Sequence, residues 1–557
     1  MELKKFVEEN YYIVISLMVF SLLFYIGLGD FFDHKLDHDY PFNFFAEDQF
    51  SHLLSAQGVK DLGHNLYVPP YMNMGFEKTF PDFGPGMSHW IVITDSVTPY
   101  IEMYNSMQLL LGIIFLLLPF IFVNALGLKQ HIKLVSLSLT PLLFQFNWII
   151  GYSWGQIGAI TGTFFLFSFY AVYNSKYWKN YWIIAILLAA ACMVHFPEGF
   201  FLVFFVGIFF IYDAYNKRKE LSKNKLRGIV KNYRWLILSV IVFLLISGFY
   251  LLIFYYGNIQ KFEEVTSTQE KKWITFTTPE EFGGIRTVKI TDFNWIILIG
   301  IVVGIVILAI FYKSRARYIL FFSLALTFLN YFGFFMFASY RAFQQRTFWP
   351  FTLMPFFSIG IFFILGEFLK IKGKTLKIIA LVLFLAIFYY SFSTYTKVTG
   401  PGVITKEQFD AFQYLDENKK DDGMVLLIYG DGYSQSHPAL KNLHVLTWEK
   451  NMVIFLEQKA DIKNNFSFLK VEWGTPAVLN GTKIDFVNTE HEYNATFCDF
   501  DYYILDKTTR FGNPLIEFNK LFVQSINEES FEVFYENAQT LILKRKSDNC
   551  WREDDNK

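Results

Sequence analysis

Eleven apolar runs divide the first 395 or so residues of this chain, and they constrain its fold more than any other feature. A helix needs about 20 mostly apolar residues to cross roughly 30 Å of hydrocarbon. The shortest runs leave a re-entrant or bent path open. The pattern predicts a polytopic α-helical membrane protein with spans at about 12–29, 104–126, 134–150, 156–173, 181–196, 199–214, 235–256, 294–312, 318–339, 347–368 and 376–394.

Composition excludes several other classes of protein. Hydrophobic residues make up 53% of the 557 positions and charged residues only 18%, against roughly 25% charged in soluble domains. This excludes a disordered chain and argues against a single soluble globule. A net charge of −1 offers no basic surface for nucleic acid, and three cysteines form neither a disulfide framework nor a zinc-binding spacing.

Lys and Arg set the expected orientation. With the N-terminus in the cytoplasm, the inner segments hold 21 basic residues in 57 positions and the outer segments 10 in 128. The first run lacks a small-residue cleavage site, so we expect a retained anchor rather than a signal peptide. The chain is therefore predicted to be an integral plasma-membrane protein. Its membrane domain spans 1–395, with outer loops at 30–103 and 257–293 and an outer C-terminal domain at 396–557.

The tail has the patterning of a soluble α/β domain. A helix is expected over 406–420, a strand from Met424, a strand from Tyr502, a helix over 514–526 and a closing hairpin over 531–544. The three Asn-x-Ser/Thr sequons of the chain all fall in this tail, which fits an extracytoplasmic location, although three sequons can arise by chance. Cys498 and Cys550 lie on the same side and either pair or remain free thiols.

The first outer loop gathers most of the polar residues that could do chemistry. It holds five of the ten histidines and an excess of carboxylates over lysines. Such a loop either binds a cation, deprotonates a substrate hydroxyl, or is simply a solvated acidic loop. A helix is predicted over 46–63, in which Asp48 and His52 are four residues apart and so share a face. Acidic residues at a helix start are also favoured by the helix dipole alone.

These features resemble the glycosyltransferase-C (GT-C) superfamily of polytopic enzymes, and distantly the archaeal oligosaccharyltransferase catalytic subunits. Asp48 and Gly63 match an acidic residue and a glycine that ends a helix, and Pro69-Pro70 with Gly84-Pro85-Gly86 supply the loop that follows. The closing hairpin at 531–544 is similar to the last strands of archaeal members. The resemblance implies a GT-C fold and sugars carried on polyprenyl phosphates.

Departures from the oligosaccharyltransferase pattern favour one branch of this superfamily. The loop 151–156 has no carboxylate where those enzymes carry metal ligands. The nearest match to their Trp-Trp-Asp-Tyr-Gly signature is the run 429–433, which lacks the tryptophans. We therefore expect an inverting, metal-independent transferase acting on a hydroxyl of a lipid-linked glycan, a polymer or a protein. No cofactor is expected to be required, although a divalent cation stays open.

Transfer to a hydroxyl needs a base near the acceptor. A second acid is unnecessary because phosphate is already a good leaving group. Asp48 is the leading candidate for the base; the alternatives are Asp39, Asp37 and Glu47, and His52 is an assisting group.

Two arginines are candidates for binding the donor phosphate. Arg341 and Arg346 lie in a short outer connection, on the side where positive charge is otherwise sparse. Arg346 also stands at the start of a span, where a helix N-terminus already favours anions. The alternative is ordinary snorkelling of arginine at the interface.

Four more residues are candidates for lining the pocket. His195 and Glu198 flank Pro197 and Gly199, which explain a tight reversal on their own. Trp154 and Gln156 are expected on the same side of the membrane. Two other functions stay open: transfer to asparagine, or a non-catalytic membrane protein that binds or transports glycan or lipid.

Overall fold

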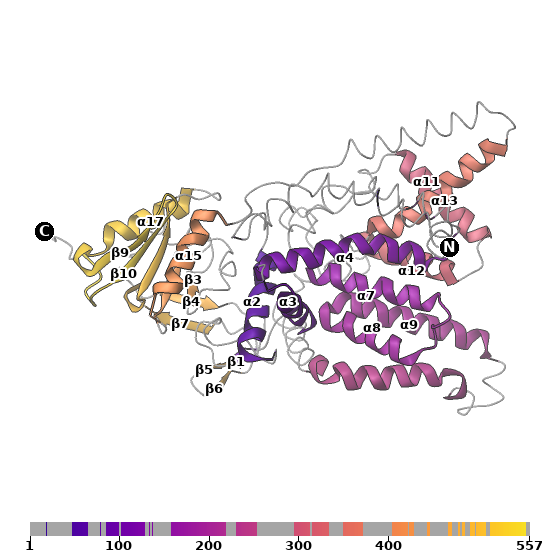
Figure 1. Ribbon diagram of the computed structural model, residues 1–557, viewed down its shortest axis with the longest axis horizontal. Coiled ribbons are helices and arrows are strands. Elements are labelled where there is room, and N and C mark those ends of the chain that lie inside the picture. Colours follow the sequence, from indigo (N-terminus) through magenta and orange to yellow (C-terminus); the bar gives the residue numbers. More distant parts are fainter. Residues whose placement is uncertain are drawn as a thin grey trace. The chain divides into compact units, whose positions relative to one another are not determined.

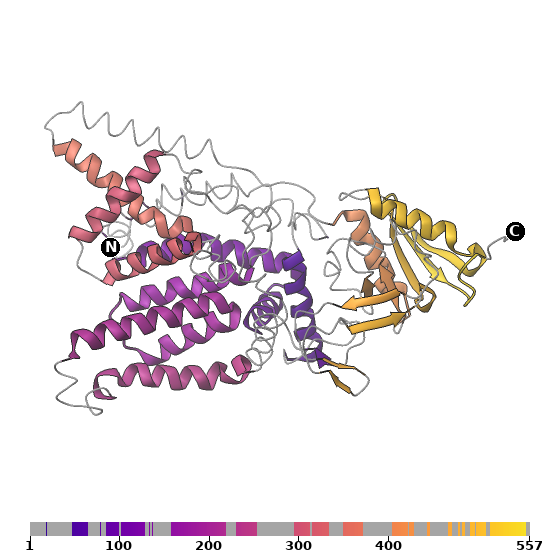
Figure 2. The ribbon, with the colours of Figure 1, turned by 180° about the vertical axis from the view of Figure 1, so that it is seen from behind.

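The computed structural model describes part of the chain, and all statements about structure refer to that part (Figures 1 and 2). It comprises residues 18, 40, 47–64, 78–79, 85–99, 102–128, 133, 136, 157–218, 230–252, 295–311, 315–332, 349–370, 404–420, 423–427, 443–445, 466–470, 477–479, 482–484, 491–495, 497–507 and 513–552.

The chain forms two compact units. Unit 1 contains Met1–His34, Ser106–Leu252 and Gln269–Thr399, and unit 2 contains Lys35–Asn105, Ile253–Thr268 and Gly400–Lys557. From the sequence we assign the whole loop 30–103 to the membrane domain. The contacts instead group most of that loop with the tail.

Unit 1 is helical, as the apolar runs predict. Eight of the eleven expected runs coincide with helices, while the runs at 12–29, 134–150 and 376–394 lie almost entirely outside the described residues. Among the described helices, Met103–Ala125, Glu198–Asn216 and Val230–Leu252 are long and apolar enough to cross a membrane. The elements are α4 (Met103–Ala125), α7 (Ile157–Tyr173), α8 (Tyr181–Val194), α9 (Phe196–Asn216), the helix Val230–Leu252, α11 (Trp295–Phe311), α12 (Arg315–Phe332) and α13 (Trp349–Lys370).

Aromatic side chains form much of the core of unit 1. Helices α7, α8 and α9 lie side by side in both ribbon views (Figures 1 and 2). The fully buried Phe205 of α9 lies 5.0 Å from the ring of Tyr170 and 4.9 Å from the ring of Phe322, centroid to centroid. The high aromatic content of the sequence is thus partly used for packing between helices.

Helices α11 and α13 cross at glycines. A methyl group on Gly304 would overlap the carbonyl oxygen of Phe356, and one on Gly360 would overlap the carbonyl oxygen of Gly300. Small residues allow two membrane helices to bring their backbones together, and dispersion then holds them. The spacing Gly300-x-x-x-Gly304 places both glycines on one face of α11.

Replacing Gly304 with alanine should force α11 and α13 apart and destabilise the protein by about 1–3 kcal/mol, the usual cost of overpacking. Thermal unfolding in detergent measures this. The matched control is Gly207→Ala on α9, because a methyl group there meets no heavy atom within 4 Å. Equal melting temperatures for the two variants would contradict the glycine crossing.

Unit 2 is built around a five-stranded mixed sheet in the order β3-β2-β8-β10-β9. Strand β2 is parallel to β3 and β8, whereas β10 is antiparallel to β8 and β9. The main elements are α15 (Lys406–Asn418), β2 (Val425–Leu427), β3 (Leu443–Val445), β8 (Tyr502–Asp506), α17 (Asn513–Ser525), β9 (Phe531–Glu536) and β10 (Thr540–Arg545). The expected helices, central strands and hairpin of the tail are present at these positions.

Two helices cover this sheet (Figure 1). The ring of Phe522 in α17 stacks 5.4 Å from that of Tyr503. The ring of Tyr502, the preceding residue of β8, lies 5.1 Å from that of Phe534. Phe534 in turn contacts the ring of Tyr414 in α15. Successive residues of a strand point to opposite faces, so α17 and α15 lie on opposite faces of the sheet. All five residues of β8 are buried, as expected for a strand covered on both sides.

Segments of the first outer loop fold together with the tail inside unit 2. Strand β1 (Lys78–Thr79) pairs antiparallel with β5 (Ala477–Leu479). The ring of Tyr40 lies 6.4 Å from that of Phe409 in α15. Tyr104, in the first residues of α4 that follow the loop and group with unit 2, lies 6.2 Å from the same ring. These contacts tie the loop that carries the candidate base to the C-terminal domain.

Candidate functional site

The predicted helix over 46–63 is α2 (Glu47–Leu62). It ends at Gly63, whose φ of 72° is the left-handed conformation that glycine adopts at a helix C-terminus. The Gly63 amide donates to the carbonyl oxygen of Val59 at 2.8 Å. The glycine that supports the family resemblance therefore has a clear structural role.

The candidate base Asp48 and its alternative Glu47 occupy the first turn of α2. His52, one turn later, is 5% exposed and is buried inside unit 2. A buried imidazole is better placed to orient a neighbour than to touch a substrate.

Helix α2 is held against α3 (Pro85–Val97) at its C-terminal end. Lys60 of α2 donates to Asp95 of α3 at 2.9 Å, and Gln57 donates to Asp61 at 2.8 Å within α2. This packing fixes the direction of α2 and hence the position of its first turn. The other candidates Asp37, Asp39, Trp154, Gln156, Arg341 and Arg346 lie outside the described residues.

In unit 1, the side chains of His195 and Glu198 form a hydrogen-bonded pair at the reversal between α8 and α9. His195 is extended, with φ −151° and ψ 115°, and caps both helices. Its Nδ1 bonds to a carboxylate oxygen of Glu198, which is 1% exposed, while the imidazole side chain is 35% exposed. A buried carboxylate thus holds a half-buried imidazole in one orientation.

Glycines allow this reversal to be tight. A methyl group on Gly199 would lie 2.6 Å from Cα of Cys192, so only glycine permits this approach of α9 to α8. On α7, methyl groups at Gly158 and Gly162 would lie 3.0 Å from the ring of His195 and 3.1 Å from the carboxylate of Glu198. The two α7 glycines therefore leave room for the paired side chains of His195 and Glu198. The spacing Gly158-x-x-x-Gly162 indicates that another segment packs closely on α7. It does not indicate that this segment is the one that carries His195 and Glu198.

Breaking this pair should have unequal costs for its two members. His195→Ala removes the ring that bonds to the buried Glu198 carboxylate, and a buried group left without its hydrogen-bond partner costs about 1–3 kcal/mol, more where it is charged. Glu198→Gln leaves the more exposed imidazole and should cost less. Thermal unfolding of the two single variants and the double variant measures this. The loss in free energy of unfolding of the double variant should be about 0.5–3 kcal/mol smaller than the sum of the losses of the two single variants. Strictly additive losses would contradict a coupled pair.

Within the described ranges, no group of three or more His, Cys, Asp or Glu side chains is arranged to hold a metal ion. The residues that the structure describes therefore include no candidate metal centre.

The comparisons with known proteins identify the fold. No protein family matches the sequence, and neither does any curated protein. The structure is similar to the Archaeoglobus fulgidus oligosaccharyltransferase tethered with an acceptor peptide containing the NVT sequon. That match has a TM-score of 0.55 and 11% identity, and it covers 98% of this chain and 75% of that chain.

It is also similar to ArnT from Cupriavidus metallidurans bound to undecaprenyl phosphate, with a TM-score of 0.51 and 10% identity, covering 96% of this chain and 98% of that chain. Both are GT-C glycosyltransferases. In two other matches to the oligosaccharyltransferase, this chain covers 65% and 64% of that chain, less than two thirds of its length. A mostly helical fold like that of these GT-C membrane enzymes is confirmed, whereas the count of eleven spans and the outer C-terminal domain stay predictions.

Proposed function

We propose that this protein is a membrane glycosyltransferase that moves a sugar from a polyprenyl-phosphate donor to a hydroxyl acceptor on the extracytoplasmic side. The acceptor would be a lipid-linked glycan, a polymer or a protein. The observation that carries the proposal is the similarity of nearly the whole chain to two GT-C glycosyltransferases, one of them bound to undecaprenyl phosphate. The expected outer location of the first loop and the tail places the candidate chemistry on that side.

The residues have distinct roles in this proposal. Asp48 takes the proton of the acceptor hydroxyl as the attacking oxygen bonds to the anomeric carbon, and the bond from that carbon to the donor phosphate breaks. His52, one turn further along α2, is the assisting group. Arg346, with Arg341 as the alternative, neutralises the departing phosphate. Asp39, Asp37 and Glu47 are the alternative bases.

His195 is proposed to contact substrate through the half-exposed side of its imidazole. Glu198 fixes the ring from its buried side, in the way that a carboxylate orients the histidine of a hydrolase triad. A positioned imidazole can donate to a phosphate or a sugar hydroxyl. Trp154 and Gln156 complete the proposed pocket.

Transfer to asparagine is the second candidate function. It is favoured by the similarity to an oligosaccharyltransferase tethered to an acceptor peptide. Against it stand the carboxylate-free loop at 151–156 and the missing tryptophan signature. A chelator separates the two, because a hydroxyl transferase without metal retains activity in it and a metal-dependent asparagine transferase loses activity.

A further inference from the structure

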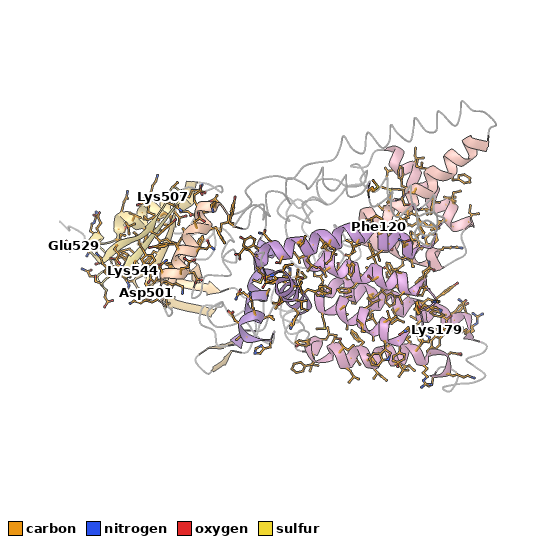
Figure 3. The ribbon with its side chains drawn as sticks, in the orientation of Figure 1. Phe120, Lys179, Asp501, Lys507, Glu529 and Lys544 are labelled. Atoms are coloured by element: carbon orange, nitrogen blue, oxygen red, sulfur yellow. A yellow bond between two sulfur atoms is a disulfide. The ribbon has the colours of Figure 1, made fainter. Side chains whose placement is uncertain are left out.

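Basic side chains gather at the end of unit 1 where α7 and α9 finish and where α8 and the helix Val230–Leu252 begin. Lys179, at this end, is labelled in Figure 3. We call these six residues the basic cluster: Lys176, Lys179, Lys217, Arg218, Lys231 and Arg234. The proposed transfer reaction uses none of them.

A single carboxylate lies among these six cations in the described segments 174–180, 213–218 and 230–235, and that carboxylate is Asp213. Its Oδ2 accepts from Lys217 Nζ at 2.8 Å and from the Tyr233 hydroxyl at 2.7 Å, and Lys179 also acts on it electrostatically. Asp213 thus joins the α7–α8 turn, the end of α9 and the start of the next helix. One negative charge leaves most of the positive charge of the cluster unbalanced.

Aromatic rings hold four of the cations in place. Lys179 Nζ lies 4.7 Å from the ring of Trp178, and the guanidinium of Arg218 lies 4.2 Å from that of Tyr215. Lys217 and Lys176 lie 5.7 and 5.0 Å from the rings of Tyr233 and Tyr177. A ring face attracts a cation but does not neutralise it. The cluster is therefore positioned yet still positively charged.

The rings themselves are packed together. Trp178 meets Trp235 edge to face at 5.5 Å, which links the α7–α8 turn to the helix Val230–Leu252. Tyr177 and Tyr215 remain more than half exposed. Tyr and Trp gather at the level of the lipid headgroups, where one end of the ring is apolar and the other is wet.

The neighbouring helix surfaces place this cluster at the edge of the hydrocarbon. On the helix Val230–Leu252, Leu245 and Leu252 are 80% and 71% exposed, and on α9 Ile211 is 67% exposed. Such apolar surface on helices long enough to span a membrane is covered by lipid tails. The cations at the ends of these helices then lie at the depth of the headgroup phosphates.

We propose that the basic cluster is a binding site for the phosphate headgroups of anionic phospholipids, with Lys176, Lys179 and Arg218 as its exposed ligands. The site discriminates by charge: an anionic headgroup balances the excess positive charge, whereas a zwitterionic headgroup brings its own cation. The expected topology places this site in the cytoplasmic leaflet. The inference does not depend on the proposed enzymatic activity.

The test titrates phosphatidylglycerol or phosphatidylcholine into the detergent-solubilised full-length protein and follows bound lipid by native mass spectrometry. We expect saturable binding of phosphatidylglycerol and clearly weaker binding of phosphatidylcholine. In Lys176→Gln/Lys179→Gln, phosphatidylglycerol binding should weaken about 25-fold, at about fivefold per cation. The charge-conserving variant Lys176→Arg/Lys179→Arg should bind phosphatidylglycerol as the parent does.

The matched control is Lys520→Gln/Lys546→Gln, which removes two exposed lysines from unit 2. This variant should bind phosphatidylglycerol as the parent does. Because Lys176 and Lys179 are exposed, the melting temperature of the glutamine variant without lipid should be unchanged, which separates lost binding from misfolding. Equal binding of the two lipids, or equal weakening in the unit 2 control, would overturn the site. Competition by inorganic phosphate at the same concentration as the lipid would overturn the assignment to a membrane headgroup.

Discussion

Asp48→Asn should lower the rate of sugar transfer about 10²–10⁴-fold, the usual contribution of a positioned general base. Asparagine has nearly the shape of aspartate and is well tolerated at a helix start, so α2 should keep its position. An amide cannot accept the acceptor's proton, however. Loss of rate with unchanged donor binding is therefore the expected result, measured with purified protein and a radiolabelled polyprenyl-phosphate sugar.

The matched control for this variant is Asp61→Asn, a carboxylate in the last turn of the same helix that is hydrogen-bonded to Gln57. It makes the same chemical change on α2 about three and a half turns from the candidate base, and it should retain most of the activity. Full activity of Asp48→Asn would remove Asp48 as the base and point to Asp37 or Asp39. Equal losses in both variants would indicate damage to α2 rather than lost chemistry.

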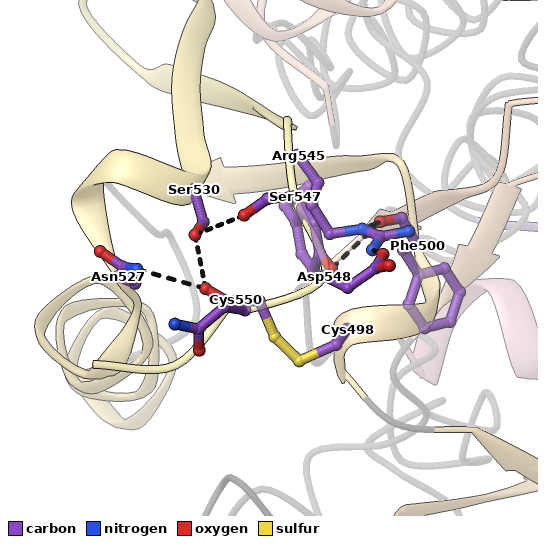
Figure 4. Close-up of a disulfide and its surroundings, with 10 residues drawn as sticks. Cys498, Phe500, Asn527, Ser530, Arg545, Ser547, Asp548 and Cys550 are labelled. Atoms are coloured by element: carbon purple, nitrogen blue, oxygen red, sulfur yellow. Dashed lines mark hydrogen bonds and ion pairs between the residues drawn. A yellow bond between two sulfur atoms is a disulfide. The ribbon is translucent and has the colours of Figure 1, made fainter. Parts of the chain in front are cut away.

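Removing the disulfide between Cys498 and Cys550 should have the second largest effect. The bond closes a loop of 52 residues in sequence, and cross-linking a loop of that length contributes about 4 kcal/mol in the chain-entropy model. Cys550 is part of the core with Tyr503, Phe522 and Phe531. Figure 4 shows how close the bond lies to the hydrogen bonds of Ser530 with Ser547 and of Arg545 with Phe500.

Hydrogen exchange of the full chain measures this effect. In Cys498→Ala/Cys550→Ala, the amides of β8, β9 and β10 should exchange far faster, while those of α7 and α8 in unit 1 should not change. The control Cys192→Ala removes the remaining cysteine, a buried free thiol on α8, and should leave the sheet protected. Three titratable thiols in the denatured, unreduced protein would contradict the disulfide.

The sequence predicts the helices of unit 1 well because span length and hydropathy are local properties. The runs at 156–173 and 294–312 correspond to α7 (Ile157–Tyr173) and α11 (Trp295–Phe311) within two residues at each end. In the tail, alternation and the Asn537 turn predict the hairpin of β9 and β10. These elements can be predicted because each pattern lies within the element's own residues and does not depend on distant contacts.

Contacts between distant segments could not be predicted in this way. Strand β1 has two residues and therefore no periodicity, yet it pairs with β5 some 400 residues later. The packing of Tyr40 and Tyr104 on Phe409 could not be predicted from the sequence either, because aromatic residues are common throughout the chain. For this reason the first outer loop is assigned to the membrane domain from the sequence and groups with the tail in the structure.

In the candidate site, too, local features could be predicted from the sequence and contacts between distant segments could not. Pro197 and Gly199 predict the reversal at His195, but the hydrogen bond of His195 with the buried Glu198 depends on the room left by Gly158 and Gly162 of α7. Glycine spacing shows that something approaches closely, not what approaches. The roles of Asp48, Arg346 and the remaining candidates stay predictions.

The most direct test of the proposed function is whether the purified protein releases polyprenyl phosphate from a polyprenyl-phosphate sugar in the presence of an acceptor. A panel of donors with different sugars, with and without chelator, covers the open choices of sugar and metal. The account predicts release that requires acceptor, persists in chelator and collapses in Asp48→Asn. Release that chelator abolishes would favour transfer to asparagine. Tight binding of a donor with no release from any member of the panel would contradict an enzyme and leave a glycan- or lipid-binding membrane protein.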